Sequence, residues 1–309
     1  MSQHLRPIIM AFALGLLPCA IFAQEESTDQ VIPSEGDQFP IHITYFPALK
    51  DANGSGLMNS PVVVLLHGEK ETRQFWNKGS APRGTNPFPV ELQKRGYAVV
   101  SVDLRKHGES VLENQADPVR NDDYQKMVLG DMAAVKNFLQ EEHQKQNLNM
   151  RKMAIVASGF SAPVAAAFAE IDWKQRPFDD HALPAKKTPR GQDVQALVFL
   201  SPDKGAGKLS TSRSLGFLKN PSMGIAFQVI VGQEDSQDFS TAKLLHKNFT
   251  TVKKNEERAE LISPKLKASG ISLMRQPPPV AYVPMLKFLD DHLKSKEIPW
   301  QDRRSRLVR

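Results

Sequence analysis

Residues 152–163 read KMAIVASGFSAP, and this stretch decides the fold class. The apolar run from Met153 to Ala157 predicts a buried strand, and the alanine-rich run from Phe160 to Ile171 predicts a helix. Only small residues and one aromatic separate them. A strand that leaves a tight turn as a helix is the geometry of a nucleophile elbow, which presents one side chain for attack. The residue at the tip of this turn therefore determines the available chemistry.

The same alternation extends along the chain. Buried strands are predicted over residues 41–46, 62–66, 97–102, 196–200 and 227–231, and helices over residues 89–95, 131–140, 241–249 and 284–293. Strands alternating with helices form right-handed βαβ units, so we expect an α/β fold with a mostly parallel sheet flanked by helices. Sites in such sheets lie beyond the carboxyl ends of the strands. Residues 204–224 are too few for a large lid domain and are expected to be mobile.

The N-terminus predicts export. Arg6 precedes an apolar run from Ile8 to Ala23, and residues 1–23 have the pattern of a secretory signal peptide. This run is short for a membrane span and contains Pro18, so we expect no transmembrane segment after cleavage. The only cysteine, Cys19, lies inside this peptide, which leaves the mature chain without thiols. We expect a periplasmic or extracellular protein.

Three further segments complete the expected organisation. Residues 24–38 are polar and predict a flexible lead-in, and residues 39–298 predict the domain. Residues 299–309 form a basic C-terminal tail in a chain of net charge +6, and we expect this tail to be solvated. Aromatic residues do not interleave with it and nucleic-acid motifs are lacking, so no nucleic-acid partner is expected.

Two loops extend the elbow pattern. His67-Gly68-Glu69 follows the strand over 62–66, and DLRKHGES at 103–110 follows the next strand. Together with the elbow, these motifs resemble the α/β-hydrolase superfamily over most of the mature chain. Lys106 stands where that family commonly has glycine, and the resemblance makes His107 part of a structural turn. It also implies that VGQED at 231–235 carries the acid position, Asp235.

A narrower resemblance rests on three other segments. DMAAVKNFL at 131–139, EIDW at 170–173 and GQDVQALVFLSP at 191–202 are similar to exported α/β-hydrolase-like proteins of planctomycete-type bacteria. In that group the elbow serine is commonly replaced. The resemblance therefore implies a degenerate elbow in this chain.

Strand length places Gly159 at the tip of the turn, with Ala157 and Ser161 as its small flanks. Glycine has no side chain and cannot attack a substrate. Ser161 is the alternative nucleophile, because GFSAP partly matches G-x-S-x-G, but this register puts Pro163 where a small residue is needed. Ser158 is a further candidate, one residue early. We expect both serines to cap the following helix.

The general base is also missing from its expected place. Acyl transfer in this fold needs a late histidine, yet residues 247–291 contain none, and His246 and His292 are displaced to either side. We therefore predict a catalytically degenerate protein, or pseudoenzyme, that acts as a ligand-binding or scaffolding module. Its pocket would be formed by His67, Gly68, Glu69 and Phe160, and would take a small molecule or a peptide.

The alternative is a serine hydrolase of the esterase or peptidase class. It would use Ser161 with Asp235 and a displaced histidine. In either case no cofactor is expected, because the chain lacks a dinucleotide fingerprint and a complete phosphate-binding loop. Metal-ligand spacing is also absent from its histidines.

Overall fold

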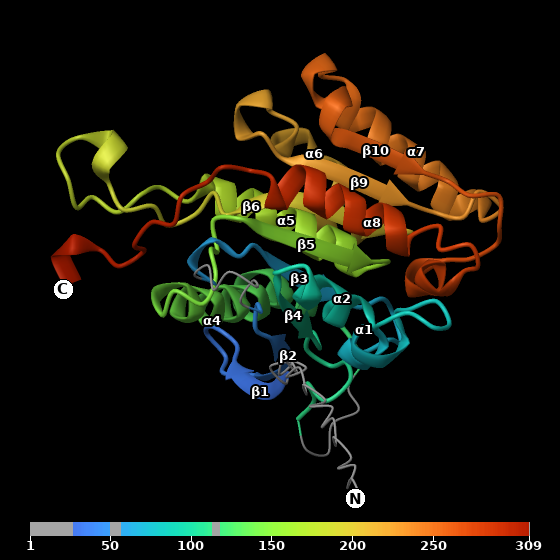
Figure 1. Ribbon diagram of the computed structural model, residues 1–309, viewed down its shortest axis with the longest axis horizontal. Helices are drawn as coiled ribbons and strands as arrows, with labels where there is room; N and C mark the ends of the chain where they lie inside the picture. Colours follow the sequence, from blue (N-terminus) through green and yellow to red (C-terminus); the bar gives the residue numbers. More distant parts are fainter. Residues whose placement is uncertain (1–26, 50–56, 113–117, 309) are drawn as a thin grey trace, which may run out of the picture.

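The computed structural model describes residues 27–49, 57–112 and 118–308. The signal peptide predicted at residues 1–23 lies outside the described residues, and so does DANGSG at residues 51–56, a sequence typical of a turn. Within them, eight strands form one sheet in the order β1-β2-β4-β3-β5-β6-β9-β10 (Figure 1). β2 pairs antiparallel with β1 and β4, and every other pair in this sheet is parallel.

The strands are β1 (Thr28–Pro33), β2 (Pro40–Phe46), β3 (Val62–Leu66), β4 (Ala98–Val102), β5 (Met153–Ser158), β6 (Val194–Leu200), β7 (Gly205–Ala206), β8 (Leu209–Ser210), β9 (Ala226–Ile230) and β10 (Ala259–Ile262). The α-helices are α1 (Arg73–Gly79), α2 (Phe88–Lys94), α3 (Asp123–Lys126), α4 (Met132–Gln144), α5 (Ser161–Lys174), α6 (Thr211–Leu218), α7 (Ser236–Thr250) and α8 (Tyr282–Leu289). π-Helical turns cover Met127–Asp131 and Asp290–Lys294. 3-10 turns cover Leu57–Asn59, Pro184–Lys186, Pro221–Met223, Lys253–Arg258, Gly270–Arg275 and Arg306–Val308.

The central strands are buried on both faces, as their continuous apolar sequences predict. In β3, Val62, Val64 and Leu66 pack with one helical layer, while Val63 and Leu65 pack with the other. Helices α4, α5 and α7 contribute side chains to the first layer, and α1, α2 and α8 to the second. Figure 1 shows α8 lying across the middle of the sheet. Two apolar layers thus enclose a sheet whose carboxyl edge stays open to loops.

The six strands predicted from sequence are confirmed, with ends that differ by at most two residues. The edge strands β1 and β10 were not predicted. Residues 28–33 lie in the segment expected to be a flexible lead-in, but they pair with β2 along their whole length. Their side chains are mostly exposed, so backbone pairing holds β1 in place without a hydrophobic pattern that sequence analysis could detect.

Two other segments are more ordered than expected. Residues 204–224 contain the β7–β8 hairpin and helix α6, whose Leu215 and Leu218 are fully buried. The C-terminal tail docks instead of being solvated: Trp300 stacks on His143 with ring centroids 4.8 Å apart. Arg303 is 2% exposed and pairs with the buried Asp193. One aromatic residue and one cation of the tail, Trp300 and Arg303, therefore contact these two partners. The composition of the tail did not indicate these contacts.

Candidate functional site

The loops that follow β3, β5, β6, β9 and β10 meet at the carboxyl edge of the sheet, because these strands are parallel neighbours. Two backbone bonds join these loops directly. Gly159 N–H donates to Leu200 O at 3.1 Å, and Asp203 N–H donates to Gly159 O at 3.2 Å. The turn after β5 is thereby fixed against the end of β6. We call the space in front of this turn the crevice.

Gly159 lies between β5 and α5 with φ +54°, in the left-handed region that favours glycine. No heavy atom outside its chain neighbours lies within 4 Å of the position that a Cβ would take. The α-carbon of Gly159 therefore faces open space in the crevice, where a side chain would project if the residue had one. The turn has the strand–turn–helix form expected from sequence, with a residue that supplies no functional group.

Ser161 is the first residue of α5 and is fully buried. Its Oγ donates to Ser158 O at 2.9 Å and accepts from Ser158 N–H at 3.0 Å. Across the described residues, the hydrogen bonds of histidine rings go to other partners. The hydroxyl of Ser161 is thus used to close the turn, and the structure brings no histidine into hydrogen-bond contact with it.

Asp235 caps the N-terminus of α7, where its Oδ1 accepts from Asp238 N–H at 3.2 Å. The neighbouring Asp238 reaches the loop after β10 instead: Ser269 Oγ donates to Asp238 Oδ2 at 2.9 Å. Ser269 lies where the late histidine was expected. The sequence predicts Asp235 as the acid, with Glu234 and Asp238 as its neighbours, and the helical turn of α7 shows that Asp238 is the carboxylate that reaches this loop.

His67 is fully buried directly after β3. Its Nε2 accepts from Leu104 N–H at 3.1 Å, which assigns the proton to Nδ1, and Nδ1 donates to Gly68 O at 2.8 Å. Burial, followed by the nearby His107, lowers the pKa of His67 to about 4. This ring is therefore neutral near pH 7 and anchors the loop after β3 to the loop after β4.

Glu71 was not among the predicted site residues. It lies in the loop after β3 and contacts the backbone of that loop. Gly68 N–H donates to Glu71 Oε2 at 2.8 Å. Burial raises the pKa of Glu71, while this N–H and the charge of Arg275 oppose the rise. The backbone N–H of Gly68, one of the predicted pocket residues, is thus bonded to a carboxylate of the chain itself.

Aromatic and acidic side chains lie beside the turn after β5. The Phe160 ring stacks on His107 at 4.9 Å with an interplanar angle of 12°, and Tyr124 lies 6.0 Å from Phe160. Burial raises the pKa of Asp203, and the negative charges of Asp238 and Glu69 raise it further. The crevice therefore combines an aromatic side with a concentration of carboxylates.

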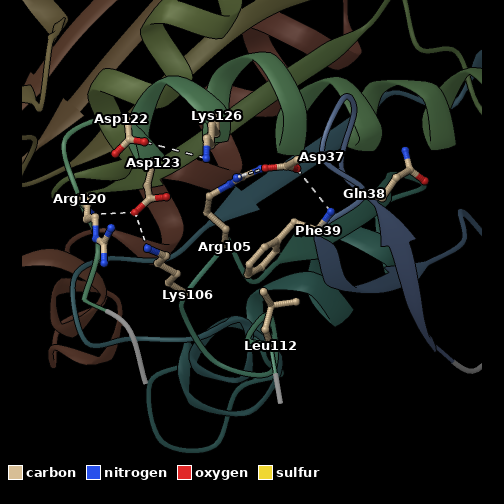
Figure 2. A pocket seen from close by; sticks show the side chains of 10 residues that line it. All are labelled: Asp37, Gln38, Phe39, Arg105, Lys106, Leu112, Arg120, Asp122, Asp123 and Lys126. Atoms are coloured by element: carbon tan, nitrogen blue, oxygen red, sulfur yellow. Dashed lines mark hydrogen bonds and ion pairs between the residues drawn. The ribbon is translucent and has the colours of Figure 1, made fainter. Parts of the chain in front are cut away.

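A separate hollow of about 380 Å³ lies beside the loop after β4 (Figure 2). Its lining is held by ion pairs. Arg105 is 2% exposed and pairs with Asp131 and Asp37, and Lys106 Nζ lies 2.7 Å from Asp123 Oδ2. These ion pairs fix the loop that carries His107, and within each pair the two charges compensate one another.

Two further searches concern metals and membranes. In the described ranges, no three histidine, cysteine, aspartate or glutamate side chains lie close enough together to hold a metal ion. None of the helices in the same ranges has the length and apolar character needed to span a membrane.

Comparison with known proteins gives structural matches only. Neither a protein-family model nor a curated protein matches the chain. An esterase from Pyrococcus furiosus is similar at 14% identity and a TM-score of 0.57, over 87% of this chain and 92% of the esterase. A dienelactone hydrolase from Anabaena variabilis is similar at 14% identity and 0.55, over 86% and 99%.

The chain has the α/β-hydrolase fold. An acylaminoacyl peptidase from Pyrococcus horikoshii also matches, at 15% identity and a TM-score of 0.57. The match covers 90% of this chain but only 43% of the peptidase, so the chain spans less than half of that protein. The α/β-hydrolase fold predicted from sequence is therefore confirmed. Sequence identities this low support a shared fold and nothing more, so the chemistry has to be argued from the residues of the crevice.

Proposed function

We propose that the protein binds a small molecule or a short peptide in the crevice and does not use Ser-His-Asp chemistry. The observation that carries this proposal is Gly159, which supplies no side chain at the turn between β5 and α5. The turn of Ser161 toward the backbone of Ser158 supports it. The presence of Ser269 in the loop after β10 supports it as well, because a serine there leaves Asp238 without a base to orient.

A second candidate function is hydrolysis by a serine nucleophile. The structural neighbours are an esterase, a dienelactone hydrolase and a peptidase, and these neighbours fit this candidate better than a binding role. It requires Ser161 to turn away from Ser158 and a displaced histidine to approach it. Asp235 would also have to leave its position as the cap of α7.

A fluorophosphonate probe tests the two candidates, because it reacts with an activated serine and leaves a structural serine unmodified. We expect no labelling of the parent protein and no ester hydrolysis above the rate of the buffer. Labelling that disappears in Ser161→Ala and persists in the control variant Ser240→Ala would overturn the binding proposal in favour of the hydrolase.

We also propose that the protein is exported and resembles the planctomycete-type group with a replaced elbow serine. This rests on the signal-peptide pattern of residues 1–23 and on the sequence segments described above. N-terminal sequencing of the protein from its host tests the first part. A mature chain that begins near residue 24 is the expected result, and an intact N-terminus in the cytoplasm contradicts it.

A further inference from the structure

A further cavity of about 380 Å³ lies between α4, the end of α5 and the segment 175–190, with Arg303 of the C-terminal tail in its lining. Its size falls in the range of about 300–1,000 Å³ that small-molecule pockets occupy. Asp172 in its lining accepts from the N–H of Val194, the first residue of β6, at 3.2 Å. This part of the cavity is therefore at the amino end of β6, whereas the crevice lies at the carboxyl edge of the sheet.

One part of the lining is apolar. Val128 and Phe168 are buried there, and Phe178 is partly exposed. Leu129 belongs to the same lining and is 62% exposed. A ligand that covers this apolar surface removes it from water, which favours binding.

The other part of the lining is charged, with three cations and one carboxylate: Lys136, Arg190, Arg303 and Asp172. Lys136 pairs with Asp172, and Arg303 pairs with the buried Asp193. Lys136 Nζ also lies 3.2 Å from Asp193 Oδ2. Two cations and two carboxylates thus compensate one another, and Arg190 is the third cation.

Arg190 has no carboxylate partner within the described ranges. Its guanidinium makes neither a hydrogen bond nor an ion pair there, and it lies over the ring of Phe178, 4.9 Å from the ring centroid. Burial lowers the pKa of Lys136, and the positive charges of Arg303 and Arg190 lower it further. The carboxylate of Asp172 opposes this effect. An anion beside Arg190 would relieve the repulsion among these cations, whereas a cation would add to it.

Geometry and charge narrow the anion to a carboxylate. The guanidinium of Arg190 carries its N–H donors in one plane and can bond to both oxygens of a carboxylate at once. One uncompensated positive charge matches a single negative charge, while a phosphate ester carries nearly two near pH 7. The buried Nε of Arg303 has no hydrogen-bond partner among the residues that the structure describes, so a further donor belongs to the lining.

We infer that this cavity binds a small organic carboxylate, with the carboxylate at Arg190 and the apolar body against Leu129 and Phe168. This inference adds a second site to the binding role proposed for the crevice and does not depend on that role.

Four fragments test this inference by heteronuclear NMR: phenylacetate, phenylacetamide, acetate and phenyl phosphate. We expect phenylacetate to shift the amide signals of Leu129, Phe178 and Arg190, with an affinity that falls as salt is added. Phenylacetamide lacks the charge and acetate lacks the ring, so each should bind roughly tenfold more weakly. Phenyl phosphate should bind no more tightly than phenylacetate, because its second charge is not compensated.

Variants of exposed residues locate the binding groups without removing buried packing. Arg190→Gln should weaken phenylacetate binding roughly tenfold. Its control, Arg176→Gln, changes an exposed arginine of the same segment that does not line the cavity, and should leave the affinity unchanged. Leu129→Ser should weaken binding roughly fivefold, whereas Leu244→Ser, at a leucine of α7 that is 51% exposed, should have no effect.

Several results would overturn the inference. Phenylacetamide that binds as tightly as phenylacetate would exclude recognition of the charge, and phenyl phosphate that binds more tightly would exclude selection of a monoanion. Unchanged affinity in Arg190→Gln, or no shifts with any fragment at millimolar concentration, would exclude the site itself. Shifts confined to Gly159 and Phe160 would place phenylacetate in the crevice, which supports the proposed function and contradicts this second site.

Discussion

The hydroxyl of Ser269 donates a 2.9 Å hydrogen bond to the carboxylate of Asp238, in the loop where a hydrolase of this fold carries its general base. Ser269 and Asp238 thus form the contact that a general base and its carboxylate make in such a hydrolase. The position of the base holds a hydroxyl instead of an imidazole. Beside them, the glycine that follows Ser269 lies against the side chain of Ser158 at the end of β5. The loop after β10 therefore approaches the elbow closely enough for a longer side chain at residue 269 to reach residue 159.

This contact predicts that two substitutions create activity. In Gly159→Ser combined with Ser269→His, the new hydroxyl enters the open space at the tip and the new imidazole is oriented by Asp238. We expect hydrolysis of p-nitrophenyl acetate about 10²-fold faster than in Gly159→Ser alone, since general-base catalysis contributes that much or more.

The left-handed backbone at residue 159 costs about 1–2 kcal/mol for any residue other than glycine, so the double variant should be less stable but folded. Ser272→His is the matched control, because it adds an imidazole three residues further on. Equal rates in the double variant and in this control combined with Gly159→Ser would show that Asp238 does not orient the new base.

A second prediction concerns Ser161, whose hydroxyl closes the turn after β5. Ser161→Ala leaves Ser158 N–H without its buried acceptor, so the free energy of unfolding should fall by about 1–3 kcal/mol. Urea denaturation measures the change. Ser240→Ala, which removes an exposed helix hydroxyl bonded to Gln237 O, should cost less than about 0.5 kcal/mol. Similar losses in both variants would argue against a structural role for Ser161.

Much of the fold could be predicted because its central strands are continuous apolar runs. VVVLL at residues 62–66 can be buried on both faces, and a run of that kind marks a strand in a covered sheet. The edge strand β1 has no such run, since it is held by backbone pairing with β2. Local sequence therefore identifies the middle of this sheet and misses its edges.

The site was predictable only in part, for a different reason. Strand length predicts Gly159 as the tip of the turn, because the turn is continuous with β5. Gly68 and Gly270 both pack closely against the side chain of Ser158, although they are distant in the sequence and meet only when β3, β5 and β10 are assembled in one sheet. No spacing rule connects such residues, so the contacts of Glu71 with Gly68 and of Asp238 with Ser269 are apparent only in three dimensions.

The docked tail leads to a third prediction. Arg303 is buried between elements that also bury Asp172 and Asp193, and Lys136 Nζ lies 3.2 Å from Asp193 Oδ2. Arg303→Met removes one of two cations and leaves an excess of buried negative charge, so the free energy of unfolding should fall by about 3–5 kcal/mol.

Arg304→Met is the control for this prediction, measured by the same urea denaturation. Arg304 is largely exposed and pairs with Asp302 beside it, and such a surface pair contributes about 0–1 kcal/mol. A small effect of Arg303→Met, comparable to that of Arg304→Met, would mean that the tail detaches readily and does not belong to the folded domain.

The last prediction follows from the burial of His67, whose pKa is about 4 in the folded protein and about 6.5 when exposed. Between these values the unfolded chain binds a proton that the folded protein excludes, so stability falls as the pH decreases from about 6.5 to about 4. Full protonation of the unfolded side chain corresponds to about 3 kcal/mol.

His67→Gln keeps a donor and an acceptor but removes the titrating ring, and every other ionisable group is shared with the parent. Denaturation at a series of pH values should therefore show a loss in the parent that exceeds the loss in His67→Gln by about 3 kcal/mol at pH 4. Parallel profiles for the two proteins would show that protonation of His67 in the folded protein costs no free energy. That result would contradict the bond in which Nε2 accepts from Leu104 N–H, because a protonated Nε2 cannot accept a hydrogen bond.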